Sequence, residues 1–306
     1  MKKSFLLLAV IFPACLFFSL AFISRENTSV TGVTVDKKKI IFIAGACSHG
    51  PGEHEHLAGC KLLASELQKQ MGNSVETSVY DLWPTDTTVL NTASAIVLYM
   101  DGGPSHLALK HLAHLKALMN KGVGLTCLHY AVEFPVEKGG PEFKQWLGGY
   151  FETYWSVNPT WEANYTKLPR HEVTNGVKPF KLYDEWYYHM RFRDNMQGIT
   201  PILSAVPPES TLSRPDGPHE GNDAVRKALG TAQHMAWLNT RPGGGRSFGF
   251  TGGHYHKNWG DSNVRKLVLN GILWTAKGTV PSGGVPAPEL SKEEMQANLD
   301  SKPCKR

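Results

Sequence analysis

Hydrophobic residues gather along this chain in short runs that alternate with amphipathic stretches. Nearly all residues of the runs 40–44, 95–100 and 124–128 are apolar, as expected of strands whose two faces are both buried. Residues 53–71 carry apolar side chains at spacings of three and four, which predicts a helix, and residues 75–80 alternate as a strand does. This order of strand, helix and strand predicts a mainly parallel sheet covered by helices on both faces.

The second half of the chain is less regular but contains the same kinds of element. Residues 199–206, 233–238 and 246–251 are expected strands, and residues 264–276 form the final predicted helix. A further helix is predicted at residues 105–120. Together these elements indicate an α/β three-layer sandwich with a mainly parallel central sheet.

The N-terminal stretch has the pattern of an export signal. Lys2 and Lys3 precede the mostly apolar residues 5–23, and cleavage is predicted after Ala21. A single transmembrane anchor and a lipoprotein site at Cys15 remain alternatives, because the apolar run approaches the length of a membrane span. All three interpretations place the remaining chain outside the cytoplasm, in the periplasm or associated with the cell envelope, with membrane contact only through the possible anchor.

These boundaries divide the chain into four parts. The parts are a signal peptide or N-terminal anchor (1–23), a polar linker (24–37), one α/β domain (38–278) and a C-terminal tail rich in proline and glycine with a short helix (279–306).

The distribution of charge along the chain does not favour a nucleic-acid partner. The 306 residues include 32 Lys and Arg against 27 Asp and Glu, which gives a formal net charge of +5. No long block of like charge accompanies this small excess, so we expect no nucleic-acid partner.

The cysteines leave their oxidation state open. An exported protein can form disulfides, but the cysteines after Cys15 show neither close pairing nor a zinc-binding spacing. Cys47 and Cys127 could approach each other if their strands are neighbours. The alternative, which we favour, is that the cysteines are buried free thiols.

Several of the 13 histidines stand where an apolar run ends. His49 follows the first run, His129 follows residues 124–128, and His254 and His256 follow the last predicted strand. Ligands of open α/β sheets bind outside the carboxyl ends of the strands. The pattern therefore predicts one site assembled from distant loops.

Two of these loops carry residues typical of metal ligands. Residues 48–56 join a strand to a helix and contain His49 and His54, although an exposed polar loop explains the same composition. In an extended backbone, His254 and His256 share a face and can chelate one cation. We therefore expect a divalent metal such as Zn²⁺, with His49, His54, His254 and His256 as its candidate ligands.

His129 lies at a turn between a strand and a helix, of the type that exposes a nucleophile in hydrolases. An imidazole at this position indicates proton transfer or metal ligation. Glu133 lies four residues further on, where it could act as a base or bind the same metal. The alternative is a core histidine and a surface glutamate.

Residues 184–193 divide into two faces if they are extended. One face carries Glu185, Tyr187, His189, Arg191 and Arg193, and the other face is apolar. This favours a polyol-binding strand, with Glu185 and His189 as catalytic candidates and Tyr187 and Arg191 as substrate-binding candidates. A half-buried strand with a solvated face explains the pattern equally well.

Three further residues are candidates for substrate binding. Trp155 and Trp259 lie near the candidate loops, and Arg214 lies in the long loop before the strand at residues 233–238. Most of the eight tryptophans are nevertheless expected to pack in the core or under loops.

Taken together, these segments resemble the trehalose-utilisation (ThuA-like) family, whose fold is similar to that of flavodoxin and class I glutamine amidotransferases. The resemblance covers roughly residues 38–278 and is carried by residues 40–49, 122–131, Gly148-Gly149-Tyr150-Phe151 and 250–254. The stretches 48–60, 184–192 and 213–219 are similar to an exported branch of the family.

The resemblance implies a function as well as a fold. Amidotransferases hold a cysteine at the elbow where this chain has His129, and His254 or His256 stands in the later loop, so glutamine hydrolysis is not expected. Membership implies a role in disaccharide or glycoside catabolism, where related pathways proceed through 3-keto sugars. A small carbohydrate is therefore the expected partner, with no nucleotide cofactor.

These expectations combine into one hypothesis and two alternatives. A base such as His129 or Glu133 removes the acidic C2 proton of a 3-keto-glycoside, a metal polarises the ketone, and Glu185 or a second histidine protonates the leaving oxygen. Isomerisation of a keto sugar uses the same opening step. The alternatives are a noncatalytic carbohydrate-binding or sensor protein on the same scaffold, and a hydrolase that uses Cys127.

Overall fold

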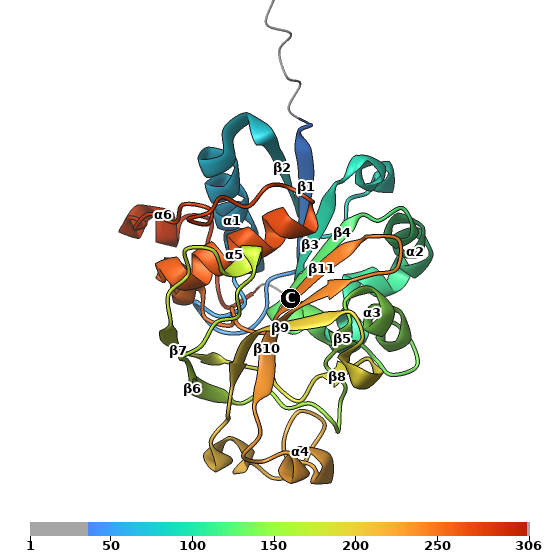
Figure 1. Ribbon diagram of the computed structural model, residues 1–306, viewed down its shortest axis with the longest axis vertical. Coiled ribbons are helices and arrows are strands. Elements are labelled where there is room, and N and C mark those ends of the chain that lie inside the picture. The colour runs from blue at the N-terminus through green and yellow to red at the C-terminus, as the bar shows by residue number, and fades with distance from the viewer. Residues whose placement is uncertain (1–35, 305–306) are drawn as a thin grey trace, which may run out of the picture. The chain divides into compact units, whose positions relative to one another are not determined.

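The computed structural model describes residues 36–304 (Figure 1). The predicted signal peptide or anchor and nearly all of the linker lie outside these residues. Within the described part of the chain, no helix is both long and apolar enough to cross a membrane.

A seven-stranded sheet forms the centre of the fold, with strand order β2-β1-β3-β4-β11-β10-β9. Its strands are β1 (Lys38–Ala44), β2 (Val75–Asp81), β3 (Ala95–Tyr99), β4 (Gly124–Leu128), β9 (Ile199–Ala205), β10 (Gln233–Thr240) and β11 (Arg246–Phe250). Neighbours from β2 to β11 in this order pair in parallel, and β10 and β9 add antiparallel pairs at one side. The predicted mainly parallel sheet is confirmed.

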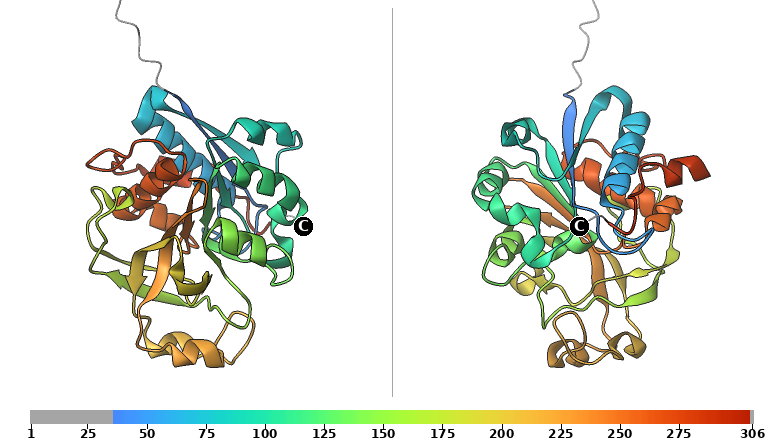
Figure 2. Two further views of the ribbon diagram at one scale, coloured as in Figure 1. Left: turned by 45° about the vertical axis from the view of Figure 1, so that its right-hand side comes forward. Right: turned by 180° about the vertical axis from the view of Figure 1, so that it is seen from behind.

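Helices cover both faces of this sheet (Figures 1 and 2). Helices α1 (His56–Met71) and α5 (Ser262–Thr275) lie on one face, and α2 (Leu112–Asn120) and α3 (Gly140–Trp146) lie on the other. Strand β1 shows why: Ile40 and Phe42 pack with the first helix pair, whereas Ile41 and Ile43 pack with the second. Alternate side chains of one buried strand thus supply two cores, which confirms the three-layer architecture.

Smaller elements surround the sandwich. Two antiparallel pairs are formed by β5 (Gly149–Tyr150) with β8 (Arg191–Phe192) and by β6 (Thr160–Tyr165) with β7 (Phe180–Glu185). The remaining helices are α4 (Asp223–Lys227) and, in the C-terminal tail, α6 (Lys292–Gln296). Ser291 and Glu294 cap the start of α6 through reciprocal hydrogen bonds between side chain and backbone.

The polar face predicted for residues 184–193 does not form. Strand β7 ends at Glu185, and His189 adopts a left-handed backbone with φ of 57° before the two-residue strand β8. An extended alternation cannot continue through such a turn, so Glu185, His189 and Arg191 point to different surroundings.

The expectation of buried free thiols holds for two of the cysteines, and the suggested bridge between Cys47 and Cys127 does not form. Cys47 forms a disulfide with Cys304, at a sequence separation of 257, and not with Cys127. Cys60 and Cys127 are buried free thiols. The pairing was not predictable from strand order because Cys304 belongs to the C-terminal tail.

Gly249 offers a test of core packing. It stands opposite Trp237 in the β10–β11 pair, and a Cβ at Gly249 would lie 2.3 Å from the indole ring of the fully buried Trp237. We expect Gly249→Ala to lower the free energy of unfolding, measured by urea titration, by about 1–3 kcal/mol through overpacking. Gly283→Ala is the control, because its Cβ would contact nothing within 4 Å. Equal effects of the two substitutions would contradict this account.

Candidate metal centre

Loops at the carboxyl edge of the parallel strands bring the candidate site together. His54 comes from the loop after β1, His129 directly follows β4, and His254 lies in the loop after β11. Glu185 is the last residue of β7. Four separate segments therefore contribute to one position at this edge, as the placement of histidines along the chain predicted.

The four side chains converge on a small volume. Nε2 of His54 lies 3.0 Å from Nδ1 of His254 and 3.1 Å from Nε2 of His129. Oε2 of Glu185 lies 3.1 Å from Nδ1 of His254 and 3.4 Å from Nε2 of His129. One ligand atom from each residue lies within 4.8 Å of all the others.

This spacing matches the coordination shell of a four-coordinate cation. Ligand atoms about 2.0–2.1 Å from a tetrahedral Zn²⁺ are about 3.3–3.4 Å from one another. The four separations given above, 3.0 to 3.4 Å, are close to that edge length. Three imidazoles and one carboxylate are also a ligand set that suits Zn²⁺ and similar first-row metals.

The hydrogen bonds at the Nδ1 atoms of His129 and His54 also favour a metal site. Nδ1 of His129 lies 2.8 Å from the carbonyl oxygen of Thr251, which can only accept, so Nδ1 carries the proton. Nδ1 of His54 lies 2.7 Å from Oδ1 of Asp101 and donates in the same way. In the neutral rings, both Nε2 atoms then present lone pairs to each other across 3.1 Å. A cation between them removes this repulsion.

The surroundings set the protonation states of the cluster side chains. Burial lowers the pKa of His54 to about 2, in spite of its hydrogen bond to Asp101, so its ring is neutral at physiological pH. Burial opposes ionisation of Glu185, but the neighbouring imidazoles of His129 and His254 outweigh it and hold the Glu185 pKa well below its usual range. Burial lowers and Glu185 raises the pKa of His254, with a net increase. The cluster therefore combines an ionised carboxylate with a neutral imidazole, as metal ligation requires.

Carboxylates in the surroundings orient the ligands. Besides Asp101 on His54, Oε1 of Glu53 lies 3.6 Å from Nε2 of His254. Burial would raise the pKa of Asp101, but its hydrogen bond to His54 and the charge of His56 lower it to about 2. Such outer partners fix ring orientation and increase ligand basicity in metal sites.

The ligand-bearing loops contain unusual backbone conformations. His49, His54 and His129 have φ of 60°, 45° and 54°, in the left-handed region. Each such residue costs about 1–3 kcal/mol and persists only where its surroundings determine it, a condition common at functional sites. At the elbow, Gly102 permits the close approach, since a Cβ there would lie 2.3 Å from the carbonyl oxygen of Tyr130.

The buried carboxylate of Asp184 holds the loop that carries His254. Asp184 accepts hydrogen bonds from the backbone N–H groups of Gly253 at 2.7 Å, His254 at 3.2 Å and Tyr255 at 3.4 Å. The hydroxyl of Tyr99 donates to the carbonyl of Gly253, whose φ of 103° suits glycine. Asp184 is fully buried, and these amides replace its water shell.

His49 lies beside the cluster. Its ring is stacked on that of His54 with centroids 3.6 Å apart, and burial lowers its pKa. His49, His54 and Asp101 form a second group of converging ligand atoms, but His54 already uses its Nδ1 to bind Asp101. The structure thus places the predicted ligand His49 next to the four-atom cluster and not within it.

Two other predicted site residues lie elsewhere. His256 begins a short 3₁₀ helix (His256–Gly260), so it does not share a face with His254, and its Nε2 bonds to the carbonyl of Met295. His189 contacts the carbonyl of Trp155 through Nδ1. The predictions of His256 as a ligand and His189 as a catalytic residue depended on extended backbone that the chain does not adopt.

Most predicted sugar-binding residues are engaged in packing. Trp259 is fully buried in the core. Arg191 lies 3.4 Å over the ring of Trp155 and forms a salt bridge with Glu152, and His189 stacks on the same indole. The aromatic faces of Trp155 are thus occupied by protein side chains, which corrects its assignment and that of Arg191.

Glu133 is part of a second polar pair. Nε2 of His219 lies 3.0 Å from both carboxylate oxygens of Glu133. The hydrogen bond to Glu133 raises the pKa of His219, and burial raises the pKa of Glu133. Tyr130 stands between this pair and the cluster, with ring centroids 6.4 Å from His219 and 5.9 Å from His54.

Tyr187 and a small cavity complete the surroundings. The hydroxyl of the buried Tyr187 lies 3.3 Å from Nε2 of His129. A cavity of about 170 Å³ includes Glu185 and Arg214 in its wall. Its other lining residues are mainly polar: Asn158, Pro159, Thr160, Ser210, Thr211 and Ser213. A larger cavity of about 590 Å³ contains none of the cluster residues.

Sequence reasoning missed three residues of this region. Asp101 directly follows the apolar run at 95–100, so the rule that singled out the histidines could have found it. Asp184 precedes the polar face, but nothing in its spacing indicates three backbone donors. His219 lies 86 positions from Glu133, and no local pattern connects them.

Cys127 does not fit the role of a nucleophile. Its thiol is fully buried in the core beneath α2 and α3, and burial raises its pKa well above the usual range. A nucleophilic cysteine requires the opposite shift.

Comparison with known proteins agrees with this architecture. Solved structures of proteins described as ThuA-like, from Bacteroides uniformis and Parabacteroides merdae, match with TM-scores of 0.54 and 0.51 at 19% and 15% identity. The matches cover 78% and 85% of this chain and 90% and 98% of those chains. A glutamine amidotransferase from Thermotoga maritima matches with a TM-score of 0.39, at 9% identity over 78% of this chain and 96% of its own.

Sequence comparison identifies the family directly. No curated protein gives a match. The profile of the ThuA family, described as trehalose utilisation, matches residues 46–275. This match spans most of the chain, and the resemblance seen in the sequence is confirmed: the protein belongs to the ThuA trehalose-utilisation family.

Proposed function

We propose that this protein is an exported enzyme that eliminates the C1 substituent of a 3-keto-glycoside, with the aid of a divalent metal. The observation that carries the proposal is the convergence of His54, His129, Glu185 and His254 next to the hydrogen-bonded pair Glu133–His219. One group is suited to hold a cation and the other to move protons. The family's link to trehalose utilisation supports a carbohydrate substrate.

The four cluster residues would hold the metal. A bound divalent cation would polarise the keto oxygen of the sugar and stabilise negative charge that develops on it. His129 and Glu185, which the sequence suggested as acid–base groups, are better suited to ligation, because their atoms face the same point as those of His54 and His254. Proton transfer then falls to groups outside the cluster.

Glu133 and His219 supply the proton transfers. In a 3-keto sugar the proton on C2 is acidic, and a carboxylate with a raised pKa is a suitable base for it. When Glu133 takes this proton, the C–H electron pair forms the C1–C2 double bond and the C1–O bond breaks. His219, whose pKa is raised by the hydrogen bond to Glu133, gives a proton to the departing oxygen. The pair gains one proton and loses one, so its net charge is unchanged.

The cavity beside Glu185 is suited to the rest of the sugar. Its wall is rich in hydroxyl and amide groups, and Arg214 contributes a cation that is partly exposed. Groups of this kind form hydrogen bonds with a polyol, whereas a largely apolar pocket would not. Arg214 is thus the one residue among the predicted side chains Trp155, Trp259, Arg191 and Arg214 that we retain for substrate binding.

Metal binding is the first test. We expect about one divalent ion per chain after incubation with Zn²⁺ and desalting, measured by elemental analysis. Glu185→Gln and His254→Asn each remove a ligand and should weaken binding by more than the about 10–100-fold typical of outer partners. His114→Asn, a substitution on α2, is the control and should keep the metal. Wild-type protein without affinity for any divalent ion would sink the proposal.

Hydrogen–deuterium exchange at C2 of the sugar tests the proton-abstraction step, whichever product follows. In D₂O, the enzyme should incorporate deuterium at C2 of a 3-keto-glycoside, detected by NMR, whether elimination or isomerisation follows. Glu133→Gln should slow exchange by about 10²–10⁴-fold, the usual contribution of a general base. Glu137→Gln, at an exposed position of the same segment, should not. A protein that only binds sugar would give no exchange in any variant.

The pKa of His219 should depend on Glu133. The hydrogen bond and charge of Glu133 raise this pKa, whereas burial of the ring lowers it. Glu133→Gln removes the raising contribution, so the His219 pKa should fall below that of the wild type. We expect NMR titration of the ring to show the protonated form lost at lower pH in the variant. An unchanged or increased pKa would show that the pair is not coupled as described.

A further inference from the structure

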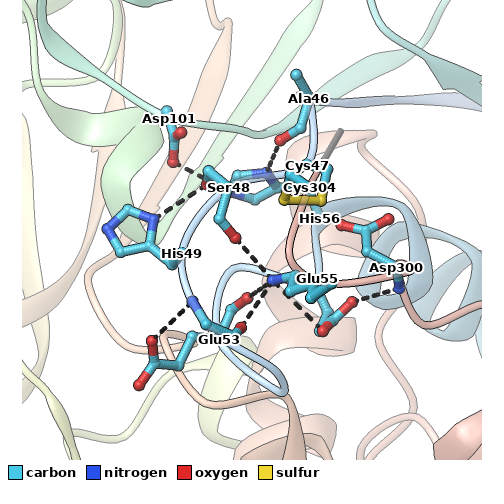
Figure 3. Close-up of a disulfide and its surroundings, with 12 residues drawn as sticks. Ala46, Cys47, Ser48, His49, Glu53, Glu55, His56, Asp101, Asp300 and Cys304 are labelled. Carbon is cyan, nitrogen blue, oxygen red and sulfur yellow. Dashed lines mark hydrogen bonds and ion pairs between the residues drawn. A yellow bond between two sulfur atoms is a disulfide. The ribbon is translucent and has the colours of Figure 1, made fainter. Parts of the chain in front are cut away.

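The C-terminal tail closes over the loop that carries His49 and His54 (Figure 3). Cys304 is joined to Cys47, which directly precedes Ser48 and His49 in this loop. The disulfide therefore attaches residues at the end of the described chain to the first ligand-bearing segment. The tail otherwise packs beside α1 and α5 (Figure 1).

The side chain of Lys302 binds the backbone of the same loop. Its ammonium donates to the backbone carbonyls of Ser48 at 2.7 Å and Gly50 at 3.0 Å, and also to that of Glu53. The side chain is only 2% exposed. Three carbonyls of one loop thus face a single buried cation supplied by a residue distant in sequence.

Glu55 completes the arrangement from the opposite side. Its carboxylate is 1% exposed and lies 3.4 Å from the Lys302 ammonium. The same carboxylate accepts a hydrogen bond from the backbone N–H of Gly52 at 3.0 Å. It also accepts one from the backbone N–H of Asp300 at 2.7 Å (Figure 3). Removing either Lys302 or Glu55 would be strongly destabilising, because it would leave the other charge buried without its partner.

This loop positions the metal ligands. His54 is held in a left-handed conformation, and its backbone N–H donates to the carbonyl of His254 at 3.0 Å. His256 N–H donates to the carbonyl of Gly52 at 2.8 Å, and Glu53 stands 3.6 Å from His254. A loop that relaxes would therefore shift His54 and the outer partner of His254 together.

We propose that residues 300–304 form a redox-dependent clamp that positions His54 for metal binding, with Lys302 and the Cys47–Cys304 disulfide as its two attachments. The metal part of this inference rests on the proposed function. The clamp closes when both attachments are made. A dithiol reductant opens it: the reductant gives two electrons and two protons to the disulfide, leaves two cysteine thiols and becomes a cyclic disulfide itself.

The test compares metal affinity in full-length variants. Zn²⁺ dissociation constants are measured by competition with a chromophoric chelator, and ligand geometry by the visible spectrum of the Co²⁺-loaded protein. We expect Lys302→Met, Cys304→Ser and dithiol-reduced wild type each to bind Zn²⁺ about 10–100-fold more weakly, the range typical of outer-shell changes. Reoxidation of the reduced wild type should restore the affinity.

Controls separate positioning from general loss of structure. Lys292→Met removes a lysine of the same tail that is exposed on α6, and its affinity should equal that of the wild type. Far-ultraviolet circular dichroism should be unchanged in all variants. Wild-type affinity in both Lys302→Met and Cys304→Ser would overturn the clamp.

Hydrogen exchange of the metal-free protein distinguishes failure of the clamp from failure of the proposed function. Amides of residues 48–56 should exchange faster in Lys302→Met and Cys304→Ser than in wild type, whether or not any metal binds. Unchanged exchange there would overturn the clamp even if the wild type binds metal. Faster exchange in a protein without metal affinity would support the clamp and reject the metal-dependent function.

Discussion

The Nε2 atoms of His54 and His129 face each other across 3.1 Å, each with its proton committed to a partner on the opposite side of its ring. Two lone pairs in this position repel, and the carboxylate of Glu185 adds negative charge to the same space. Such an arrangement forms only if the surrounding chain enforces it or a cation relieves it. Most of the unusual features at this edge of the sheet hold these side chains in place. The same arrangement would suit a bound cation.

Buried polar groups hold the backbone that keeps these side chains close together. His54 and His129 have left-handed conformations, and the loop of His254 is fixed by three amides on the carboxylate of Asp184. These groups are charged or strained and would be unfavourable in isolation. Their mutual satisfaction fixes the cluster side chains, so a cation could bind them with little rearrangement.

Sequence patterns predicted the parts of this site that strand geometry controls. Apolar runs located β1, β4 and β11, and the rule that ligands bind at carboxyl ends then placed His54, His129 and His254 at one edge. The reasoning failed where a single residue changes direction: His189 turns the chain after β7, and the 3₁₀ helix at His256 separates it from His254. Contacts between distant loops, such as Glu133 with His219, leave no periodic trace.

The span of the disulfide also sets an order of assembly. Cys47 is synthesised 257 positions before Cys304, so the loop between β1 and α1 waits for nearly the whole domain before its last attachment can form. During early folding, the histidine-rich segment of residues 48–56 is present without this constraint. The loop of residues 48–56 therefore reaches its final geometry only after the C-terminal tail has been synthesised and has docked on it.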